Sequence, residues 1–383
     1  MKQKILKVMA GLLLMVTMCL AGQNNECRAD DRMMTAKKGV VEIQSGYTNQ
    51  DGKFFPVKNC SGFLINNSDN NVYIVTTYSG IIITEKEEKA FYKANKISKD
   101  SGMVNKSVRL IVEGDVSSEL SQVASSETSD FCILNSANII NEKSTVSLEN
   151  VKEINAGDEI YALGFRSQDN IATNQFFTNE VSITQGSIQE VSVNISGKSL
   201  IQHTANIDTG NSGGITINSE GYVVGMNNAK YSSNEGIYFA TPVSEIIEVL
   251  NNYGIIYQSR KREKQLTDLE KTYEDCERII NSDEYALEDR EGLQSVLENA
   301  KTTSGNINSL KDEEIKKQIE TLTDVKTGIK KKISKVFIYM IIFALVDLGL
   351  VVWLVIILIK RHKKGKNREI KSIQKTDSEA FDK

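Results

Sequence analysis

The stretch TGNSGG, residues 209–214, is the strongest indication of fold in this chain of 383 residues. Its glycines allow a tight turn in which the N–H groups of Gly210 and Ser212 can point to one spot. Two converging N–H groups beside a serine hydroxyl suit acyl transfer, because they can hold the oxyanion that forms. The loop predicts a nucleophile at Ser212 with an oxyanion hole at Gly210 and Ser212, although the same residues also fit an ordinary hairpin.

Short runs of β-branched and aromatic residues surround this loop from about Gly39 to Gly254, separated by Gly, Asn and Ser. Many short strands at such spacing are typical of a β-barrel or a β-sandwich. The runs are residues 40–43, 62–65, 72–76, 107–112, 159–163, 191–193 and 222–226. One helix is expected to close this region, at residues 243–251. The fold class is therefore predicted to be mainly β.

Several segments, taken in order, resemble the trypsin-like serine proteases of the bacterial HtrA/Deg type. They are residues 61–65 (SGFLI), 157–164 (GDEIYALG), 184–188 (TQGSI), 201–208 (IQHTANID), 221–227 (GYVVGMN) and 236–242 (GIYFATP). The resemblance extends over roughly residues 40–250 and implies two six-stranded antiparallel β-barrels, with the site in the cleft between them. The corresponding domain is predicted to span residues 36–254.

The resemblance also assigns the members of a catalytic triad. It places the nucleophile at Ser212 and the orienting carboxylate at Asp130, which precedes a short apolar run. The base should close the second strand in a Val-Thr-x-x-His pattern, but residues 75–79 are VTTYS. Ser79 therefore stands in place of the histidine base, and a shift of one residue in either direction offers no histidine.

Neither of the two histidines of the chain is placed as a base. His203 lies nine residues before Ser212, on the strand that feeds the loop, so its side chain is expected to point away from the nucleophile. His362 follows a predicted membrane span. Loss of one triad member lowers the rate by on the order of 10⁴ to 10⁶. Ser212 is therefore expected to be a poor nucleophile.

The N-terminus is predicted to be a secretory signal over residues 1–21, with cleavage after Ala21 or as late as Ala29. Lysines precede an apolar run at residues 8–21 that is too short to span a bilayer comfortably. The net charge of −4 argues against a nucleic-acid partner. The chain has no metal-ligand spacing, and we expect neither a metal nor a cofactor.

A second apolar run, residues 336–359, is long enough to cross a membrane. Basic residues are more numerous after it than before it, so the tail at residues 360–383 is predicted to be cytoplasmic. The chain is thus predicted to be a single-pass type I protein of the cell membrane with an extracytoplasmic main domain, which fits a Gram-positive surface. Asp347 interrupts the run, and it either pairs with another chain or is tolerated there.

Residues 258–335 differ in character, because they lack proline and place apolar residues at helical spacing. We expect two or three amphipathic helices that form a stalk, a coiled-coil-like hairpin or a small bundle, with Ser282 and Ser309 as N-caps. An extended, partly ordered stalk is the alternative. Signal cleavage would leave four cysteines, and free thiols or any of three disulfide pairings stay open among Cys27, Cys60, Cys132 and Cys276.

Three functions stay open. The first is a pseudoprotease that binds a peptide or protein segment in the cleft between the barrels. The second is an active serine endopeptidase with an atypical base or with a base from a partner. The third is a structural scaffold of the cell envelope that acts through its helices. The helices or Asp347 could also mediate homo-oligomerisation.

Overall fold

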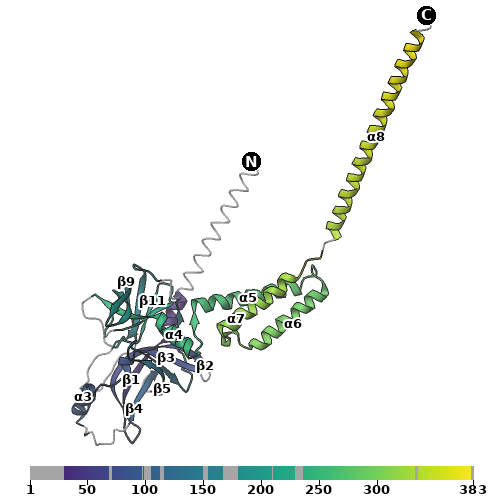
Figure 1. Cartoon of the computed structure of the whole chain (residues 1–383). Helices are drawn as coiled ribbons and strands as arrows, with labels where there is room; N and C mark the ends of the chain where they lie inside the picture. Colours follow the sequence, from purple (N-terminus) through teal and green to yellow (C-terminus); the bar gives the residue numbers. More distant parts are fainter. Residues whose placement is uncertain are drawn as a thin grey trace. The chain divides into compact units, whose positions relative to one another are not determined.

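A computed structural model describes residues 30–68, 71–96, 98, 105–112, 116–149, 154–166, 180–208, 210–228, 236–332 and 335–380. The predicted signal segment, with Cys27 and Ala29, lies outside these residues. Two compact units divide the chain, Met1–Thr267 and Asp268–Lys383, and each is described by itself. Figure 1 labels their helices and strands.

The first unit begins with helical residues 30–39 and a closed antiparallel barrel of six strands (Figure 1). The barrel order is β1 (Val40–Thr48), β2 (Phe54–Ser68), β3 (Asn71–Thr76), β6 (Phe131–Ser136), β5 (Val116–Ser126) and β4 (Asn105–Val112). β1 pairs with both β2 and β4, which closes the barrel. Alternate residues such as Val41, Ile43 and Leu64 fill its interior, as the period of a strand requires.

Two helices lie between β3 and β4 in the chain. α2 (Tyr78–Ile81) is a single turn directly after β3. α3 (Glu85–Asn95) begins at a capping box in which the side chains of Thr84 and Glu87 satisfy each other's backbone N–H groups. α2 therefore fixes the backbone where the sequence predicts Ser79 to replace a histidine.

The second barrel follows in the same unit. Its order is β11 (Ile215–Asn218), β8 (Glu159–Phe165), β9 (Val181–Ile195), β10 (Lys198–His203), β13 (Tyr238–Pro242) and β12 (Val223–Asn227). The pairing of β11 with β12 closes it. β7 (Ser147–Leu148) and β14 (Gln258–Ser259) extend the sheet from β12 as parallel strands. The prediction of two six-stranded antiparallel barrels is confirmed, as is the closing helix, α4 (Val243–Asn252).

One apolar core joins the two barrels. Val40, Phe63 and Val75 of the first barrel belong to the same buried cluster as Leu163 and Ile215 of the second. Burial of each such side chain stabilises the folded state by about 1.5–3 kcal/mol. The two barrels therefore pack as one body, and residues at their junction have fixed neighbours.

The second unit contains the helices of the C-terminal region. α5 (Arg260–Ile280) starts in the first unit and continues into the second. It is followed by α6 (Leu287–Ser304), the 3₁₀ turn η2 (Ile307–Ser309) and α7 (Asp312–Gly328). Five buried side chains on these helices are Leu269, Cys276, Leu293, Ile315 and Leu322. Three amphipathic helices are thus present, at the upper end of the expected number.

The predicted N-caps in this region are wrong. α6 begins after Ala286 and α7 after Lys311. Ser282 instead accepts a hydrogen bond from the N–H of Glu284 in a turn, and Ser309 ends the 3₁₀ turn η2. Serine oxygen atoms can stabilise short turns as well as helix starts, so the local pattern did not distinguish the two.

The last helix is α8 (Lys335–Ala380). Its segment Ile338–Arg361 is long and apolar enough to cross a membrane, and none of its residues is buried. It overlaps the predicted span at residues 336–359 and includes Asp347. One such helix is compatible with a single membrane anchor.

Candidate active site

Ser79 and Asp130 meet at the end of the first barrel. The N–H of Ser79 donates to Oδ1 of Asp130 at 2.7 Å, and the Ser79 hydroxyl donates to Oδ2 at 3.0 Å. Asn228 Nδ2 donates to the same Oδ2 at 3.3 Å. Asp130 is 1% exposed and has a φ of 52°, a conformation that the short polar side chain of aspartate tolerates. The carboxylate is thus held by a serine where the resemblance places an imidazole.

Lys58 of β2 contacts the backbone of Ser79. Its Nζ donates to the carbonyls of Ser79 (2.8 Å) and Ile82 (3.2 Å) and to Oε1 of Glu87 at 2.9 Å. Burial raises the pKa of Glu87, but hydrogen bonds from Thr84 and Lys58 outweigh it and leave that pKa below its usual value. Nζ of Lys58 thus has three acceptors, two backbone carbonyls and one carboxylate.

The loop that carries Ser212 is closed by its own hydrogen bonds. The N–H of Asn211 donates to the carbonyl of Asp208 at 3.0 Å, and the N–H of Gly214 donates to the carbonyl of Asn211 at 2.9 Å. Gly210 and Gly213 have φ values of 93° and 83°, which glycine adopts at no steric cost. The sequence therefore has glycine where the turn requires it. Thr209 lies outside the described residues.

The side chain of Asn211 holds the loop from within. Its Oδ1 accepts from the N–H of Asp208 at 2.7 Å. Its Nδ2 donates to the carbonyl of Phe165 at 3.2 Å and to Oγ of Ser182 at 3.1 Å. The residue is 3% exposed, so these bonds are shielded from water. Asn211 thus connects the loop to strands β8 and β9.

Ser61 of β2 connects the same loop to the first barrel. Its N–H donates to the carbonyl of Ser212 at 2.9 Å, and its hydroxyl donates to the carbonyl of Gly210 at 2.7 Å. The same hydroxyl accepts from the N–H of Phe165 at 2.7 Å. Its carbonyl accepts from Oγ1 of Thr76 at 2.7 Å, three residues before Ser79. Ser61 therefore links the loops of Ser212 and Ser79.

The structure thus brings together Ser79 with Asp130, and Ser212 with the neighbouring strand of the first barrel. The assigned roles, and the oxyanion hole at Gly210 and Ser212, stay predictions. Sequence reasoning did not single out Ser61 or Asn228 as site residues. Ser61 lies in a motif that carried the resemblance, and Asn228 directly follows strand β12, so position alone could have marked both.

His203 is buried in the second barrel, at the end of β10. Its ring stacks on Tyr238 with centroids 6.2 Å apart. Backbone groups of Phe239 and Ala205 are close to it, but neither ring nitrogen has a partner of good hydrogen-bonding geometry among the described residues. Burial lowers the pKa of His203 to about 4, against weaker opposing effects of these backbone groups. The imidazole is therefore neutral at pH 7.

The three described cysteines are free and buried. Sγ of Cys60 lies 3.4 Å from Oγ1 of Thr76. Burial raises the pKa of Cys60 to about 11 and that of Cys132 to about 12. Cys276 is buried in the second unit. Within the described ranges, no three His, Cys, Asp or Glu residues are placed to hold a metal ion.

Residues 60–226 match the family model of the trypsin-like peptidase domain. Together with the two barrels, this match defines the first unit as a trypsin-like peptidase domain. The chain is also similar to several bacterial proteins named serine protease Do-like HtrA.

The serine protease Do-like HtrA of Lactobacillus helveticus is 31% identical over 118 residues, which cover 28% of this chain and 27% of that protein. Its counterpart in Lactococcus lactis subsp. cremoris is 26% identical over 204 residues, covering 50% of this chain and 44% of that protein. The chain thus spans less than half of these curated relatives. The crystal structure of the serine endoprotease from Yersinia pestis aligns with a TM-score of 0.41 and 21% identity, over 58% of this chain and 65% of that one.

Proposed function

We propose that this chain is a membrane-anchored pseudoprotease whose peptidase domain lies outside the cytoplasm. It binds a peptide or protein segment in the cleft between the barrels and does not cleave it. The observation that carries the proposal is the pair of hydrogen bonds from Ser79 to Asp130. A serine hydroxyl accepts hydrogen bonds but is far too weak a base to take up a proton as an imidazole does.

Chemistry at Ser212 would need a group that takes its proton. The carboxylate of Asp130 accepts hydrogen bonds from Ser79 and Asn228, and Nζ of Lys58 donates to three acceptors. His203 is packed inside the second barrel, against Tyr238. Removal of a triad member lowers rates by on the order of 10⁴ to 10⁶. These contacts support loss of turnover.

The remainder of the site supports binding. The loop of Ser212 keeps its hydrogen bonds to Asp208, Asn227 and Ser61, and it is held without an imidazole. An extended segment can add to the edge of a strand beside such a loop, with main-chain hydrogen bonds that do not depend on a base. The apolar segment Ile338–Arg361 would hold the domain at the membrane, and the basic residues after it favour a cytoplasmic tail.

The test of turnover uses the full chain in detergent micelles and a fluorophosphonate probe, with casein hydrolysis as a second readout. Three proteins are compared: wild type, Ser79→His and the double variant Ser79→His/Ser212→Ala. We expect no labelling of wild type, labelling at Ser212 in Ser79→His, and none in the double variant. Labelling of wild type at Ser212 would show an active protease and overturn the proposal. Silence of Ser79→His would favour a scaffold whose cleft has no remaining chemistry.

The test of binding uses fluorescein-labelled, unfolded casein and fluorescence anisotropy. Wild type and Ser212→Ala should bind it equally, because strand addition does not involve the serine hydroxyl. A bulky side chain in the loop itself, in Ser212→Trp, should abolish binding, because Ser212 is only partly buried and the large indole ring would fill the space beside it. Binding that survives this substitution would place the ligand elsewhere on the chain.

A further inference from the structure

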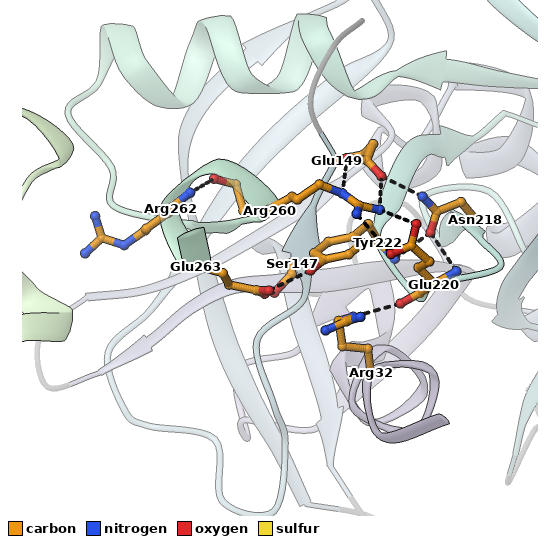
Figure 2. Close-up of polar contacts among 10 residues, drawn as sticks. Arg32, Ser147, Glu149, Asn218, Glu220, Tyr222, Arg260, Arg262 and Glu263 are labelled. Atoms are coloured by element: carbon orange, nitrogen blue, oxygen red, sulfur yellow. Dashed lines mark hydrogen bonds and ion pairs between the residues drawn. The ribbon is translucent and has the colours of Figure 1, made fainter. Parts of the chain in front are cut away.

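A second polar cluster lies away from Ser79 and Asp130, where α5 begins (Figure 2). Nε of Arg260 donates to Oε1 of Glu149 at 2.7 Å, and a terminal nitrogen donates to Oε2 at 2.9 Å. The other terminal nitrogen donates to Glu220 at 2.9 Å. The Glu149 side chain is 1% exposed, and that of Arg260 is 27% exposed. A bidentate guanidinium–carboxylate pair of this kind fixes both distance and orientation.

This cluster holds the turn between β11 and β12. Nδ2 of Asn218 donates to Oε2 of Glu149 at 2.6 Å. Oδ1 of Asn218 accepts from the N–H groups of Glu220 and Tyr222, at 3.1 and 3.0 Å. The N–H of Glu149 donates to the carbonyl of Val223 at 2.9 Å. Glu149 thus holds the turn through both its carboxylate and its backbone N–H.

Tyr222 adds a second connection between this turn and the start of α5. Its ring lies between two guanidinium groups, with Arg260 at 4.1 Å and Arg32 at 4.6 Å from the centroid, as Figure 2 shows. Its hydroxyl donates to Oε2 of Glu263 at 2.7 Å, and Oγ of Ser147 donates to Oε1 of Glu263 at 2.6 Å. The first turn of α5 is therefore held to the barrel by stacking and by hydrogen bonds.

The other ends of β11 and β12 belong to the candidate active site. The N–H of Gly213 donates to the carbonyl of Asn227, and the N–H of Asn227 donates to the carbonyl of Gly214, each at 2.9 Å. Oγ1 of Thr216 donates to Oδ1 of Asn227 at 2.7 Å inside the hairpin. The next residue, Asn228, donates to Asp130. A hairpin of four and five residues per strand thus connects the Arg260 cluster with the loops of Ser212 and Asp130.

We infer that Arg260 is a positioning residue for the Ser212 loop. With Glu149 it fixes the position of the β11–β12 turn. Because the hairpin is short and hydrogen-bonded along its length, this turn also restricts the positions of Gly213, Gly214 and Asn228 at the opposite end. The first turn of α5 then acts as a part of the peptidase domain, and a displacement of that turn alters the site. Coupling of this kind is reciprocal, so a ligand that orders the Ser212 loop also strengthens the attachment of α5.

Hydrogen–deuterium exchange with mass spectrometry on the full chain in detergent tests this inference. The variant is Arg260→Gln, and the matched control is Arg278→Gln, which breaks only an exposed pair with Asp275 on the same helix. Arg260→Gln should speed exchange about tenfold at Gly213, Gly214 and Asn227, because opening there would cost less by about the net contribution of one hydrogen bond. Strands β4 and β5 should not change, and Arg278→Gln should behave as wild type throughout.

Two outcomes would overturn the inference. The first is faster exchange confined to residues 218–222 and 258–263, which would show a local support without reach to the site. The second is a uniform increase over both barrels in Arg260→Gln, which would show only lost stability. Against the second outcome, two milder variants are compared. Arg260→Lys keeps the charge but loses the bidentate pair with Glu149, whereas Glu220→Gln keeps that pair and should leave Gly213 and Gly214 as in wild type. If Arg260→Lys changes all strands alike, or leaves Gly213 and Gly214 unchanged, Arg260 does not position the site.

Discussion

Ser79 binds both carboxylate oxygens of Asp130, one through its N–H at 2.7 Å and one through its hydroxyl at 3.0 Å. The serine therefore satisfies a carboxylate that is 1% exposed. A buried carboxylate without such donors would destabilise the fold. Ser79 is thus expected to stabilise the folded state through Asp130.

Ser79→Ala is expected to destabilise the peptidase domain by about 1–3 kcal/mol, because one buried oxygen of Asp130 loses a donor while the N–H bond remains. Urea unfolding followed by circular dichroism measures this change. Ser121→Ala, at an exposed position on β5, is the control and should change the free energy of unfolding by less than about 0.5 kcal/mol. Equal stability of the two variants would mean that the hydroxyl contributes nothing to Asp130.

Gly213→Ala is expected to destabilise more strongly. The φ of Gly213 is 83°, and an added Cβ would lie 2.1 Å from the carbonyl oxygen of Ser61. Gly236→Ala is a matched control, because its φ is 86° but a Cβ there meets nothing within 4 Å. The control should lose about 1–2 kcal/mol from its backbone conformation alone. Gly213→Ala should lose at least about 2 kcal/mol more, since overpacking adds to that cost.

Because His203 is buried, the free energy of unfolding of the domain is expected to depend on pH. Its pKa is about 4 when folded and near 6.5 when unfolded, so the unfolded state binds the proton first as pH falls. The stability contributed by neutral His203 is complete above about pH 6.5 and is lost as pH falls toward about 4. The difference corresponds to roughly 3 kcal/mol.

His203→Leu tests this dependence by removing the proton site and keeping an apolar side chain. Free energies of unfolding at about pH 7, 5.5 and 4.5 are compared. Wild type should lose about 2–3 kcal/mol more than the variant over this range, because carboxylates titrate in both proteins alike. Parallel curves for the two proteins would show that His203 takes up its proton in the folded state as readily as in the unfolded state.

The thiols of Cys60 and Cys132 are expected to resist alkylation by iodoacetamide at pH 8 in the folded protein. Both are buried, and burial raises their pKa values to about 11 and about 12, so the reactive thiolate is scarce. Peptide mass spectrometry should find them modified only after addition of urea. Modification of either one in the native protein would show that the first barrel opens readily at this end.

The strand pattern and the ordered motifs predicted the two barrels, and the family resemblance assigned Ser79 and Asp130 to one site without predicting that Ser79 donates to Asp130. These features depend on local periodicity and on residues at fixed positions along the strands. The turn that contains Ser79 lies directly after β3, so its place followed from the strand that precedes it.

The sequence did not predict the Arg260 cluster. Arg260 and Glu149 are 111 residues apart, and each lies beside other charged or polar residues that offer no means of pairing them. The predicted end of the peptidase domain at Gly254 rested on a change of composition. In the structure, β14 adds Gln258 and Ser259 to the sheet before α5 begins. Long-range polar contacts of this kind become visible only when the barrels are assembled.

The hydrogen bonds of Asn211 bear on the stage of folding at which the Ser212 loop becomes ordered. The amide side chain binds Asp208, Phe165 and Ser182, all within the chain that surrounds the loop. A loop held by these internal partners becomes ordered as the surrounding strands fold. Its shape is therefore set by the folding of the barrels themselves.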